Sequence, residues 1–266
     1  MNAALLRARG MLLLGLALLL GACATPPQGA DGEIRTDSDQ SSAERRARVR
    51  LELASAYFER GQANTALDEI KLALAAKPDL AEAFNLRGLV YASLGELPLA
   101  EQSFQRALQL APRDGDTLHN YGWYLCQQRR FDDAEVQFNA ALAAPQYAEG
   151  PRTLMARGVC QARAGRWLEA ERHLGRAFEL DPASPGIAFA YAEVLYQRGE
   201  YERARFYVRR INSQADQSNA QTLWLAARIE RRIGNMSGVN DFARQLRERF
   251  PDSPEAQRLL RGQFDD

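Results

Sequence analysis

The sequence of 266 residues is poor in cysteine, histidine and lysine, and it has no excess of charge of either sign. It contains three cysteines and two histidines, and only Lys71 and Lys77 of its 34 basic residues are lysine. Three cysteines exclude a scaffold built from disulfides. The 34 basic and 34 acidic residues cancel, which argues against a nucleic-acid-binding protein with a basic surface. The composition is that of a globular protein of one or two domains.

Long hydrophobic runs are also missing, except for one near the N-terminus. Arg7 and Arg9 precede an apolar run over residues 11–20, which would rise about 15 Å as a helix, half the hydrocarbon thickness of a bilayer. The run is too short for a permanent span and predicts a signal peptide over residues 1–22. Its ending, Leu-Gly-Ala-Cys, resembles the bacterial lipobox, which implies that Cys23 becomes the lipidated first residue. The alternative is an ordinary signal peptide that is cut nearby.

The residues after Cys23 predict a lipid-anchored chain on a linker. In lipoproteins an aspartate after the cysteine retains the protein at the inner membrane. Here Ala24 follows, so the resemblance implies the periplasmic face of the outer membrane. Residues 24–42 are rich in Pro, Gly, Ser and Asp, and Ile34 is their one strongly apolar residue, so they cannot bury a core. We expect a lipidated cysteine and flexible linker over residues 23–43, with a typical reach of roughly 25 Å.

From Ala47 onward the sequence repeats every 34 residues. Small residues recur at positions 8 and 20 of each period, large apolar residues at position 24 and glycine at position 15. The members are Ala54, Gly88, Gly122, Gly158 and Ala192; Ala66, Ala100, Ala134, Ala170 and Ala204; Ile70, Phe104, Phe138, Leu174 and Val208; and Gly61, Gly95, Gly165 and Gly199. The small residues let two helices approach closely, and the large residue fills the gap beside them. Glycine suits the turn between the helices. This pattern resembles the tetratricopeptide repeat.

The resemblance implies an all-α fold, a right-handed superhelical solenoid of six tetratricopeptide repeats. We expect the repeat domain over residues 44–262. Its repeats would occupy approximately residues 47–80, 81–114, 115–148, 151–184, 185–218 and 219–252. The sixth repeat departs from the pattern, because it has one inserted residue and Val239 in place of alanine at position 20. A short capping helix is expected over residues 254–262, since a proline opens it and a solenoid needs its last face covered.

The sequence carries no motif for catalysis or for binding a cofactor or metal. A glycine-rich phosphate loop, G-x-S-x-G, H-E-x-x-H and C-x-x-C are all absent. His119 and His173 fall in different repeats, on opposite sides of the expected solenoid, which argues against a metal site between them. The paired acids Asp132 and Asp133 suit the start of a helix. We expect a protein that is not an enzyme and that uses no cofactor.

Cys126 and Cys160 fall on the first helices of the third and fourth repeats, which are neighbours in the stack. Their axial offset of about 3 Å puts a disulfide within reach. A bridge closing this loop would stabilise the fold by roughly 3 to 4 kcal/mol. The alternative is two buried free thiols that pack as small apolar residues.

In tetratricopeptide repeats, positions 2, 5, 9, 12 and 13 of the first helices line the concave surface. In this sequence those positions include Leu51, Ser55, Phe58, Asn85, Leu89, His119, Trp123, Met155, Val159, Phe189, Glu193, Tyr196 and Leu223. Such an apolar and aromatic stripe is typical of a peptide-binding groove, although residues at this spacing can equally belong to the core. The family's best-known clamp for a C-terminal carboxylate uses lysine at position 5 and asparagine at positions 6 and 9. Here position 5 carries no lysine and position 9 carries no asparagine, so we expect an extended or helical partner segment with apolar side chains.

The combination of lipobox, polar linker, six repeats and two cysteines resembles the type IV pilus biogenesis and stability lipoproteins of the PilF/PilW type. The resemblance is strongest over residues 117–142 and 152–182, where Cys126 and Cys160 match the family's cysteine pair, and Cys23 matches its lipidated residue. It implies a monomeric outer-membrane pilotin that binds the secretin subunit and promotes its localisation and multimerisation. The alternative, with the same fold and anchor, is a periplasmic scaffold for envelope enzymes or for outer-membrane protein assembly.

Overall fold

The computed structural model describes residues 37–264, which form thirteen α-helices and no strand. The helices are α2 (Asp37–Glu59), α3 (Ala63–Ala76), α4 (Ala81–Ser93), α5 (Leu97–Leu110), α6 (Gly115–Gln127), α7 (Phe131–Leu142), α8 (Gly150–Arg163), α9 (Trp167–Leu180), α10 (Pro185–Gln197), α11 (Tyr201–Asn212), α12 (Ala220–Ile233), α13 (Met236–Arg249) and α14 (Pro254–Leu260). None of these helices is long and apolar enough to cross a membrane. The predicted signal peptide and Cys23 lie outside the described residues.

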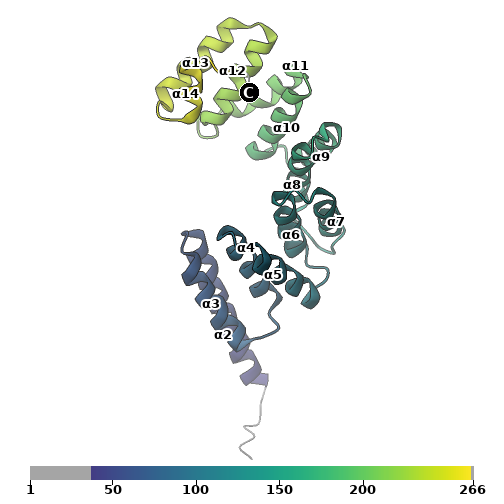
Figure 1. Ribbon diagram of the computed structural model, residues 1–266. Coiled ribbons are helices and arrows are strands. Elements are labelled where there is room, and N and C mark those ends of the chain that lie inside the picture. The colour runs from purple at the N-terminus through teal and green to yellow at the C-terminus, as the bar shows by residue number, and fades with distance from the viewer. Residues whose placement is uncertain (1–36, 265–266) are drawn as a thin grey trace, which may run out of the picture.

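The helices pack in consecutive pairs, and the pairs stack into a curved row (Figure 1). Each pair is one tetratricopeptide repeat, from α2 with α3 at one end to α12 with α13 at the other. The second helix of each pair contacts the first helix of the next pair, and α14 packs against both helices of the last pair. The predicted all-α fold of stacked repeats is therefore confirmed.

Within a pair, the missing side chain of a glycine makes room for a large residue of the second helix. A Cβ atom on Gly122 would lie 2.9 Å from the Phe138 ring, and one on Gly158 would lie 2.6 Å from Cγ of Leu174. Both distances are below van der Waals contact, and both large side chains are fully buried. The packing between positions 8 and 24 predicted from the sequence is confirmed.

The turn inside each repeat needs one residue with a left-handed backbone. Gly61, Gly95, Gly165 and Gly199 take this conformation, with φ between +74° and +78°. The third repeat has no glycine at that position, and there Arg129 adopts φ of 60°. A residue with a side chain is disfavoured in this region, so the third turn carries a local cost that the five turns with glycine avoid, including that of the sixth repeat at Gly234.

The first helix begins earlier than the repeat pattern predicts. Helix α2 starts at Asp37, ten residues before the predicted first repeat and inside the predicted linker. Nζ of Lys77 donates a hydrogen bond of 3.1 Å to Oε1 of Glu44, which ties this extension to the end of α3. The polar residues of this segment cannot form a core, but they can extend a helix that the folded first repeat has already nucleated.

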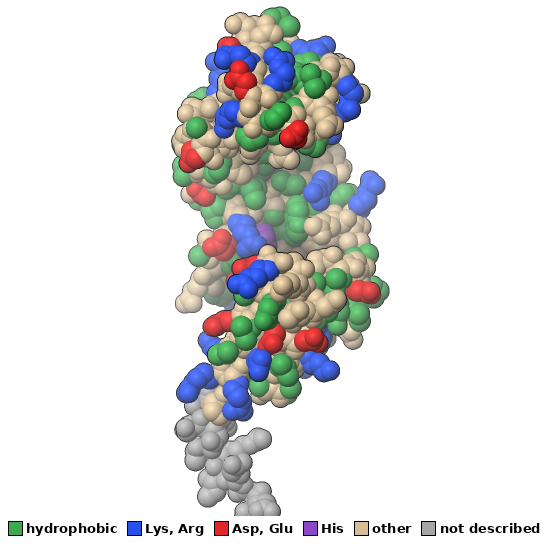
Figure 2. All heavy atoms as spheres, turned by 90° about the vertical axis from the view of Figure 1, so that its left-hand side faces the viewer, with side chains coloured by type: hydrophobic (Ala, Val, Ile, Leu, Met, Phe, Trp, Pro, Cys, Tyr) green, Lys and Arg blue, Asp and Glu red, His purple; other side chains and the backbone are tan. Residues whose placement is uncertain are grey.

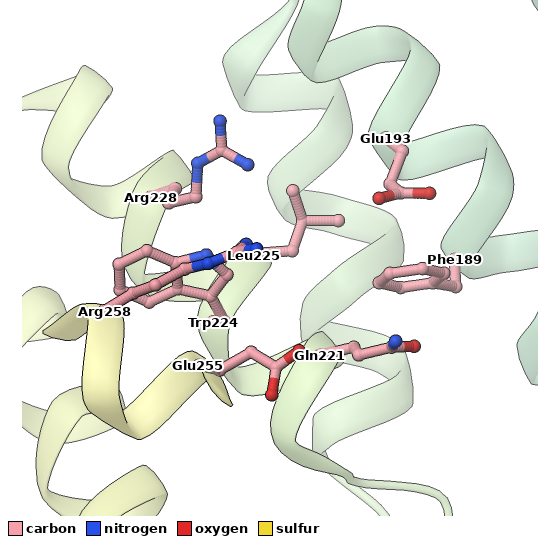
Figure 3. Close-up of a pocket in the computed structure, with 8 residues that line it drawn as sticks. All are labelled: Phe189, Glu193, Gln221, Trp224, Leu225, Arg228, Glu255 and Arg258. Atoms are coloured by element: carbon pink, nitrogen blue, oxygen red, sulfur yellow. The ribbon is translucent and has the colours of Figure 1, made fainter. Parts of the chain in front are cut away.

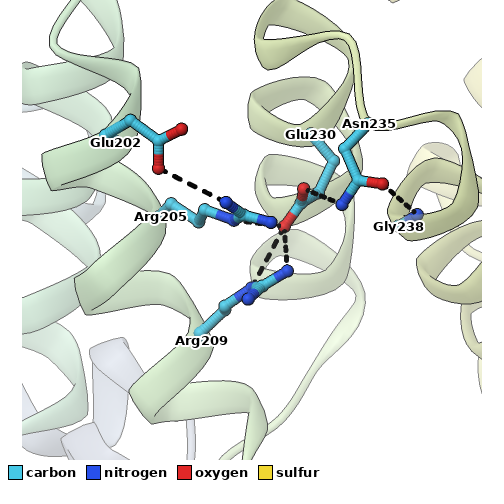
Figure 4. A network of polar contacts seen from close by, with 6 residues as sticks. All are labelled: Glu202, Arg205, Arg209, Glu230, Asn235 and Gly238. Atoms are coloured by element: carbon cyan, nitrogen blue, oxygen red, sulfur yellow. Dashed lines mark hydrogen bonds and ion pairs between the residues drawn. The ribbon is translucent and has the colours of Figure 1, made fainter.

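The last repeat is joined to the fifth by a buried charge cluster (Figure 4). Oε1 of Glu230 in α12 accepts hydrogen bonds from Nε of Arg205 at 2.9 Å and from Nη2 of Arg209 at 2.7 Å, both on α11. Nδ2 of Asn235 donates to the other carboxylate oxygen at 2.7 Å. Glu230 is only 1% exposed, so its charge is compensated almost entirely by these three side chains.

A concave groove as the candidate functional site

The candidate site lies on the concave side of the row, along the first helices α8, α10 and α12. Figure 2 shows this side of the molecule, with hydrophobic side chains gathered in the hollow and charged side chains spread around it. In the C-terminal half two adjoining pockets open between neighbouring first helices. First helices of successive repeats meet at an angle across the concave face, which leaves such spaces between them.

One pocket of about 370 Å³ lies between α10, α12 and α14 (Figure 3). It is lined by Phe189, Glu193, Gln221, Trp224, Leu225, Arg228, Glu255 and Arg258. Phe189 and Glu193 form the wall from α10, and Leu225 and Arg228 face them from α12. The pocket thus combines apolar and aromatic side chains with charged groups of both signs.

A second pocket of about 340 Å³ lies between α8 and α10. Its lining comprises Val159, Ala162, Arg163, Trp167, Ala190, Glu193, Val194 and Gln197. Glu193 lines both pockets, so the two spaces adjoin, and we call them together the groove across α8, α10 and α12. A groove of this kind fits a peptide segment whose apolar side chains enter successive pockets.

Aromatic rings hold the arginines of the groove in place. The guanidinium of Arg163 lies 4.9 Å from the centre of the Trp123 ring, and that of Arg228 lies 4.7 Å from the centre of the Tyr196 ring. Nε of Arg228 also donates to the carbonyl oxygen of Phe264 at 3.1 Å. Cations fixed in this way keep their charge at a defined position, which favours binding of a partner of matching polarity.

Two polar groups of the groove are affected by their surroundings. Glu193 is an exposed residue, but desolvation of its carboxylate by the groove raises its pKa, and the nearby Arg228 offsets part of this effect. The indole Nε1–H of Trp224 is buried and has no hydrogen-bond partner in the described part of the chain. A buried donor without an acceptor is costly, and this one is enclosed in the core cluster under the cap.

The predicted groove residues divide into accessible and buried sets. Nine of them are half-buried: Leu51, Ser55, Phe58, Asn85, Leu89, Trp123, Met155, Val159 and Phe189. Val159 and Phe189 line the two pockets. The others continue along the concave positions toward α2, where Leu51 and Phe58 pack against the core of the first repeat.

His119 does not lie on the accessible surface of the groove, contrary to the sequence prediction. Its side chain is 5% exposed, and Nδ1 makes a hydrogen bond of 2.8 Å with Oγ1 of Thr153. The same hydroxyl bonds to the phenol of Tyr147 at 2.7 Å. Burial, with a contribution from Arg152, lowers the pKa of His119 to about 4. His119 is therefore a neutral structural residue between the third and fourth repeats.

Tyr196 and Leu223 are also core residues, and here too the prediction is wrong. Tyr196 is 6% exposed, packs on Tyr201, and accepts a hydrogen bond of 3.3 Å from Nε of Arg232. Leu223 is fully buried beside Trp224 in the cluster under the cap. Tyr196, at position 12 of α10, faces the neighbouring first helix α12, and α10 and α12 are in contact. This contact covers Tyr196, so its side chain does not line the groove.

Several groove residues are not among those predicted. Arg163 and Gln197 occupy position 13, so the repeat positions could have indicated them, but they are not apolar. Arg228 has no such signal in the degraded sixth repeat. Glu255 and Arg258 enter the groove because α14 folds against α12, and no repeat pattern specifies that contact.

Away from the groove, Cys126 and Cys160 form a disulfide between α6 and α8, with their Cα atoms 5.8 Å apart. Both cysteines are buried, and the bridge ties the third repeat to the fourth. Over residues 37–264 there is no group of three or more His, Cys, Asp or Glu side chains that could hold a metal ion. His173, the second histidine, is buried on α9.

Comparison with known families identifies the repeat unit. Three tetratricopeptide repeat families match the chain, over residues 79–146, 122–171 and 161–229. Together these matches cover residues 79–229, from the second repeat into the first helix of the sixth. They agree with the helix pairs of the structure.

Comparison with individual proteins gives similarity over the whole length. The chain is 27% identical over 249 residues to the type IV pilus assembly protein PilF of Pseudomonas aeruginosa, covering 94% of this chain and 96% of that protein. Its structure is similar to the crystal structure of PilW, a widely conserved type IV pilus biogenesis factor, with a TM-score of 0.75, 28% identity, and coverage of 80% and 98%. A structure of P. aeruginosa PilF has the same fold, with a TM-score of 0.70, 24% identity, and coverage of 84% and 99%.

Proposed function

Because the chain is a tetratricopeptide repeat protein related to the PilF and PilW type IV pilus assembly factors, we propose that it is a pilotin of type IV pilus biogenesis. In this proposal an outer-membrane lipoprotein binds the secretin subunit and promotes its localisation and multimerisation. The observation that carries the proposal is the similarity to PilF over 94% of this chain and 96% of that protein. Similarity over the full length concerns the whole arrangement of repeats, whereas a single shared repeat would indicate only the fold.

The concave groove is the proposed binding site for the secretin subunit. Its two adjoining pockets offer apolar surface from Val159, Val194 and Phe189, with Arg228 and Glu193 on opposite walls. A segment with alternating apolar and polar side chains fits this arrangement. Acyl chains on Cys23 would hold the complex at the membrane, since more than one chain gives stable anchoring.

The proposal is tested by deleting the gene and following secretin multimers in the outer membrane. We expect monomeric secretin and no surface pili in the deletion strain, and recovery of both on expression of the wild-type chain. Normal multimers in the deletion strain would refute the pilotin role. Envelope pull-downs that yield cell-wall enzymes but no secretin would favour the scaffold function instead.

A matched pair of variants tests the groove. Val159→Asp places a charge in the pocket between α8 and α10, whereas Val136→Asp places the same charge on α7, where the native side chain is 62% exposed. We expect only Val159→Asp to fail in restoring multimers. Circular dichroism must show that both variants fold, and equal function of the two variants would remove the groove from the proposal.

The anchor is tested separately with Cys23→Ala. This variant should appear in the soluble periplasmic fraction, because the acyl chains have no attachment site. Membrane association that is unchanged in Cys23→Ala would contradict the anchor without affecting the groove.

A further inference from the structure

The N-terminal end of the row presents a stacking surface that no described helix covers. On the outer face of α2, Val49 is 51% exposed and Leu53 is 39% exposed. Together with Ser42, Arg45, Arg46 and Arg50 they line a shallow hollow of about 480 Å³. We name these six residues the open end face.

The repeat register shows how unusual this exposure is. Thirty-four residues separate Val49 from its counterpart in the second repeat, and the counterparts in the second to fifth repeats are Ala83, Thr117, Thr153 and Ile187. In the irregular sixth repeat the same register falls on Gln221, which is exposed. Of the four counterparts in the second to fifth repeats, the first three are 0% exposed and Ile187 is 3% exposed. In each of these four cases the second helix of the preceding repeat packs against that first helix, so the open end face is an internal stacking surface without its neighbour.

The counterparts of Leu53 in other repeats show which side chains a covering helix places at this position. The counterpart Tyr121 is 7% exposed and packs on Phe104 of the preceding second helix, with ring centres 5.6 Å apart. The counterpart Tyr191 is equally buried and lies 6.5 Å from the ring of Phe178. A covering helix therefore brings a large apolar side chain to this position.

The covering helices also bring carboxylates to the same position. The hydroxyl of Tyr121 donates to Oε1 of Glu101 at 2.9 Å, and Nε of Arg157 donates to Oε2 of Glu135 at 3.0 Å. Tyr121 and Arg157 are the counterparts of Leu53 in the third and fourth repeats. An acidic residue on the covering helix is thus part of the stacking pattern in the middle of the row.

Basic side chains surround the apolar centre of the open end face. Arg45 and Arg46 are exposed, and Arg46 donates a hydrogen bond of 3.2 Å to the nearby hydroxyl of Ser42. Arg50 is paired with Glu69 of its own repeat at 2.9 Å. Two exposed guanidinium groups next to two exposed apolar side chains match a helix that carries apolar and acidic residues on one face.

We propose that the open end face binds an amphipathic, acidic α-helix of another protein, laid in the place of a preceding second helix. The apolar side chains of that helix would cover Val49 and Leu53, and its carboxylates would face Arg45 and Arg46. This site is distinct from the concave groove, which lies on α8, α10 and α12, so it provides a second point of contact with a partner.

Two other occupants of the open end face, a second copy of the chain and a lipid surface, fit it less well. Two copies of the chain joined through this face would bring Arg45 and Arg46 of one copy toward the same basic helix of the other, and like charges at an interface are unfavourable. A lipid surface would contact only two apolar side chains, too few for an interfacial helix with a large apolar face. A helix of another protein, by contrast, would cover Val49 in the way that the preceding second helix covers its counterparts in the second to fifth repeats.

The test places a photoreactive benzoylphenylalanine at residue 49 of the full-length chain, in cells of the native host. We expect a crosslink to one envelope protein, and mass spectrometry should locate it in a helical peptide that contains at least one acidic residue. The adduct should fall several-fold in an Arg45→Glu, Arg46→Glu background, because both carboxylate contacts become repulsive. It should persist in the Val159→Asp groove variant, which separates this site from the proposed function.

Four results would overturn the proposal. They are an adduct of twice the mass of the chain, an adduct that does not respond to charge reversal, an adduct no stronger than that from the same probe at Val136, and an adduct to lipid alone. Binding to lipid is checked by flotation of Cys23→Ala protein with vesicles of phosphatidylethanolamine and phosphatidylglycerol. We expect the charge-reversed variant Arg45→Glu, Arg46→Glu to float to the same extent as the unchanged chain.

Discussion

The junction of the third and fourth repeats differs from the junction of the fifth and sixth repeats in the sign of its charges. At the earlier junction the second helix α7 supplies the carboxylate of Glu135, and α8 supplies Arg157 and Gln161. At the later junction the second helix α11 supplies Arg205 and Arg209, and α12 supplies the carboxylate of Glu230. The helices stack in the same order at both junctions.

The two junctions also differ in how exposed their charges are. The side chain of Glu135 is 25% exposed and that of Glu230 is 1% exposed. The earlier junction has a disulfide between Cys126 and Cys160 beside its ion pair, whereas the later junction depends on a satisfied buried carboxylate. Apolar shape sets the stacking of repeats in both places, and complementary charges then distinguish one junction from another.

The largest effect is expected from removing both arginines of the later junction. In Arg205→Ala, Arg209→Ala the buried Glu230 keeps only its bond from Asn235, and an uncompensated buried charge costs about 3 to 5 kcal/mol. Hydrogen exchange of the α12 amides measures this loss. Adding Glu230→Gln removes the charge and should restore part of the stability; no recovery would mean that lost packing, and not charge, is responsible.

The disulfide of the earlier junction is expected to contribute nearly as much. Its cysteines are 34 residues apart, and by the chain-entropy argument Cys126→Ala, Cys160→Ala should lower the free energy of unfolding by roughly 3 to 4 kcal/mol. Denaturant unfolding of oxidised and reduced wild-type protein measures the same difference. Two free thiols in denatured, unreduced Cys23→Ala protein would show that the bridge is absent.

Acid should weaken the earlier junction and spare the later one. His119 keeps a pKa of about 4 in the folded protein against 6.5 for an exposed imidazole, so the unfolded chain takes up the proton first as the pH falls. Stability from the neutral imidazole is complete above about pH 6.5 and decreases as the pH falls toward 4. At pH 5 the loss is about 2 kcal/mol.

Hydrogen exchange as a function of pH tests this prediction. Amides of α6 and α8 should lose protection at pH 5 relative to pH 7, whereas α11 and α12 contain no histidine and serve as the internal reference. His119→Gln should remove most of the difference between the two pH values, and the remainder belongs to His173, whose pKa is also lowered by burial and by Arg157 at the same junction. A loss of protection that persists in full in His119→Gln would assign the acid sensitivity to another group.

The smallest effect is expected from an exposed ion pair between the same two repeats. Nη2 of Arg166 lies 2.8 Å from Oδ1 of Asp132, and their side chains are 42% and 86% exposed. Pairs of this kind contribute little in water. Asp132→Asn should leave the thermal midpoint unchanged, and a clear shift would show that surface charge contributes to this junction.

The contacts within each repeat follow from the sequence with little ambiguity. The spacing of Gly122 and Phe138, or of Gly158 and Leu174, predicts which residues touch, and the structure places them in contact. The turn glycines are equally predictable, because a left-handed residue is required at one fixed position. The third repeat shows the limit, since Arg129 takes the same backbone conformation without glycine.

The groove is less predictable, because accessibility depends on helices outside the repeat in question. Val159 and Phe189 lie where position 9 and position 5 suggest, whereas Tyr196 is covered by a neighbouring first helix. His119 is buried through a hydroxyl of the next repeat. The position of a residue in its repeat indicates the direction of the side chain, but the neighbouring repeat decides whether anything covers it.

The period of 34 residues therefore specifies the helix pairs, their turns and the order in which the repeats stack, because these depend on contacts between residues that are close in the chain. The stack as a whole specifies the rest. It buries Glu230 between two arginines, brings α14 into the groove, and leaves Val49 uncovered although its counterparts in the second to fifth repeats are buried. These features depend on which helix packs against each surface in the folded stack. The same spacing of residues in two repeats therefore does not decide whether the corresponding surface is covered by a neighbouring helix or is left exposed.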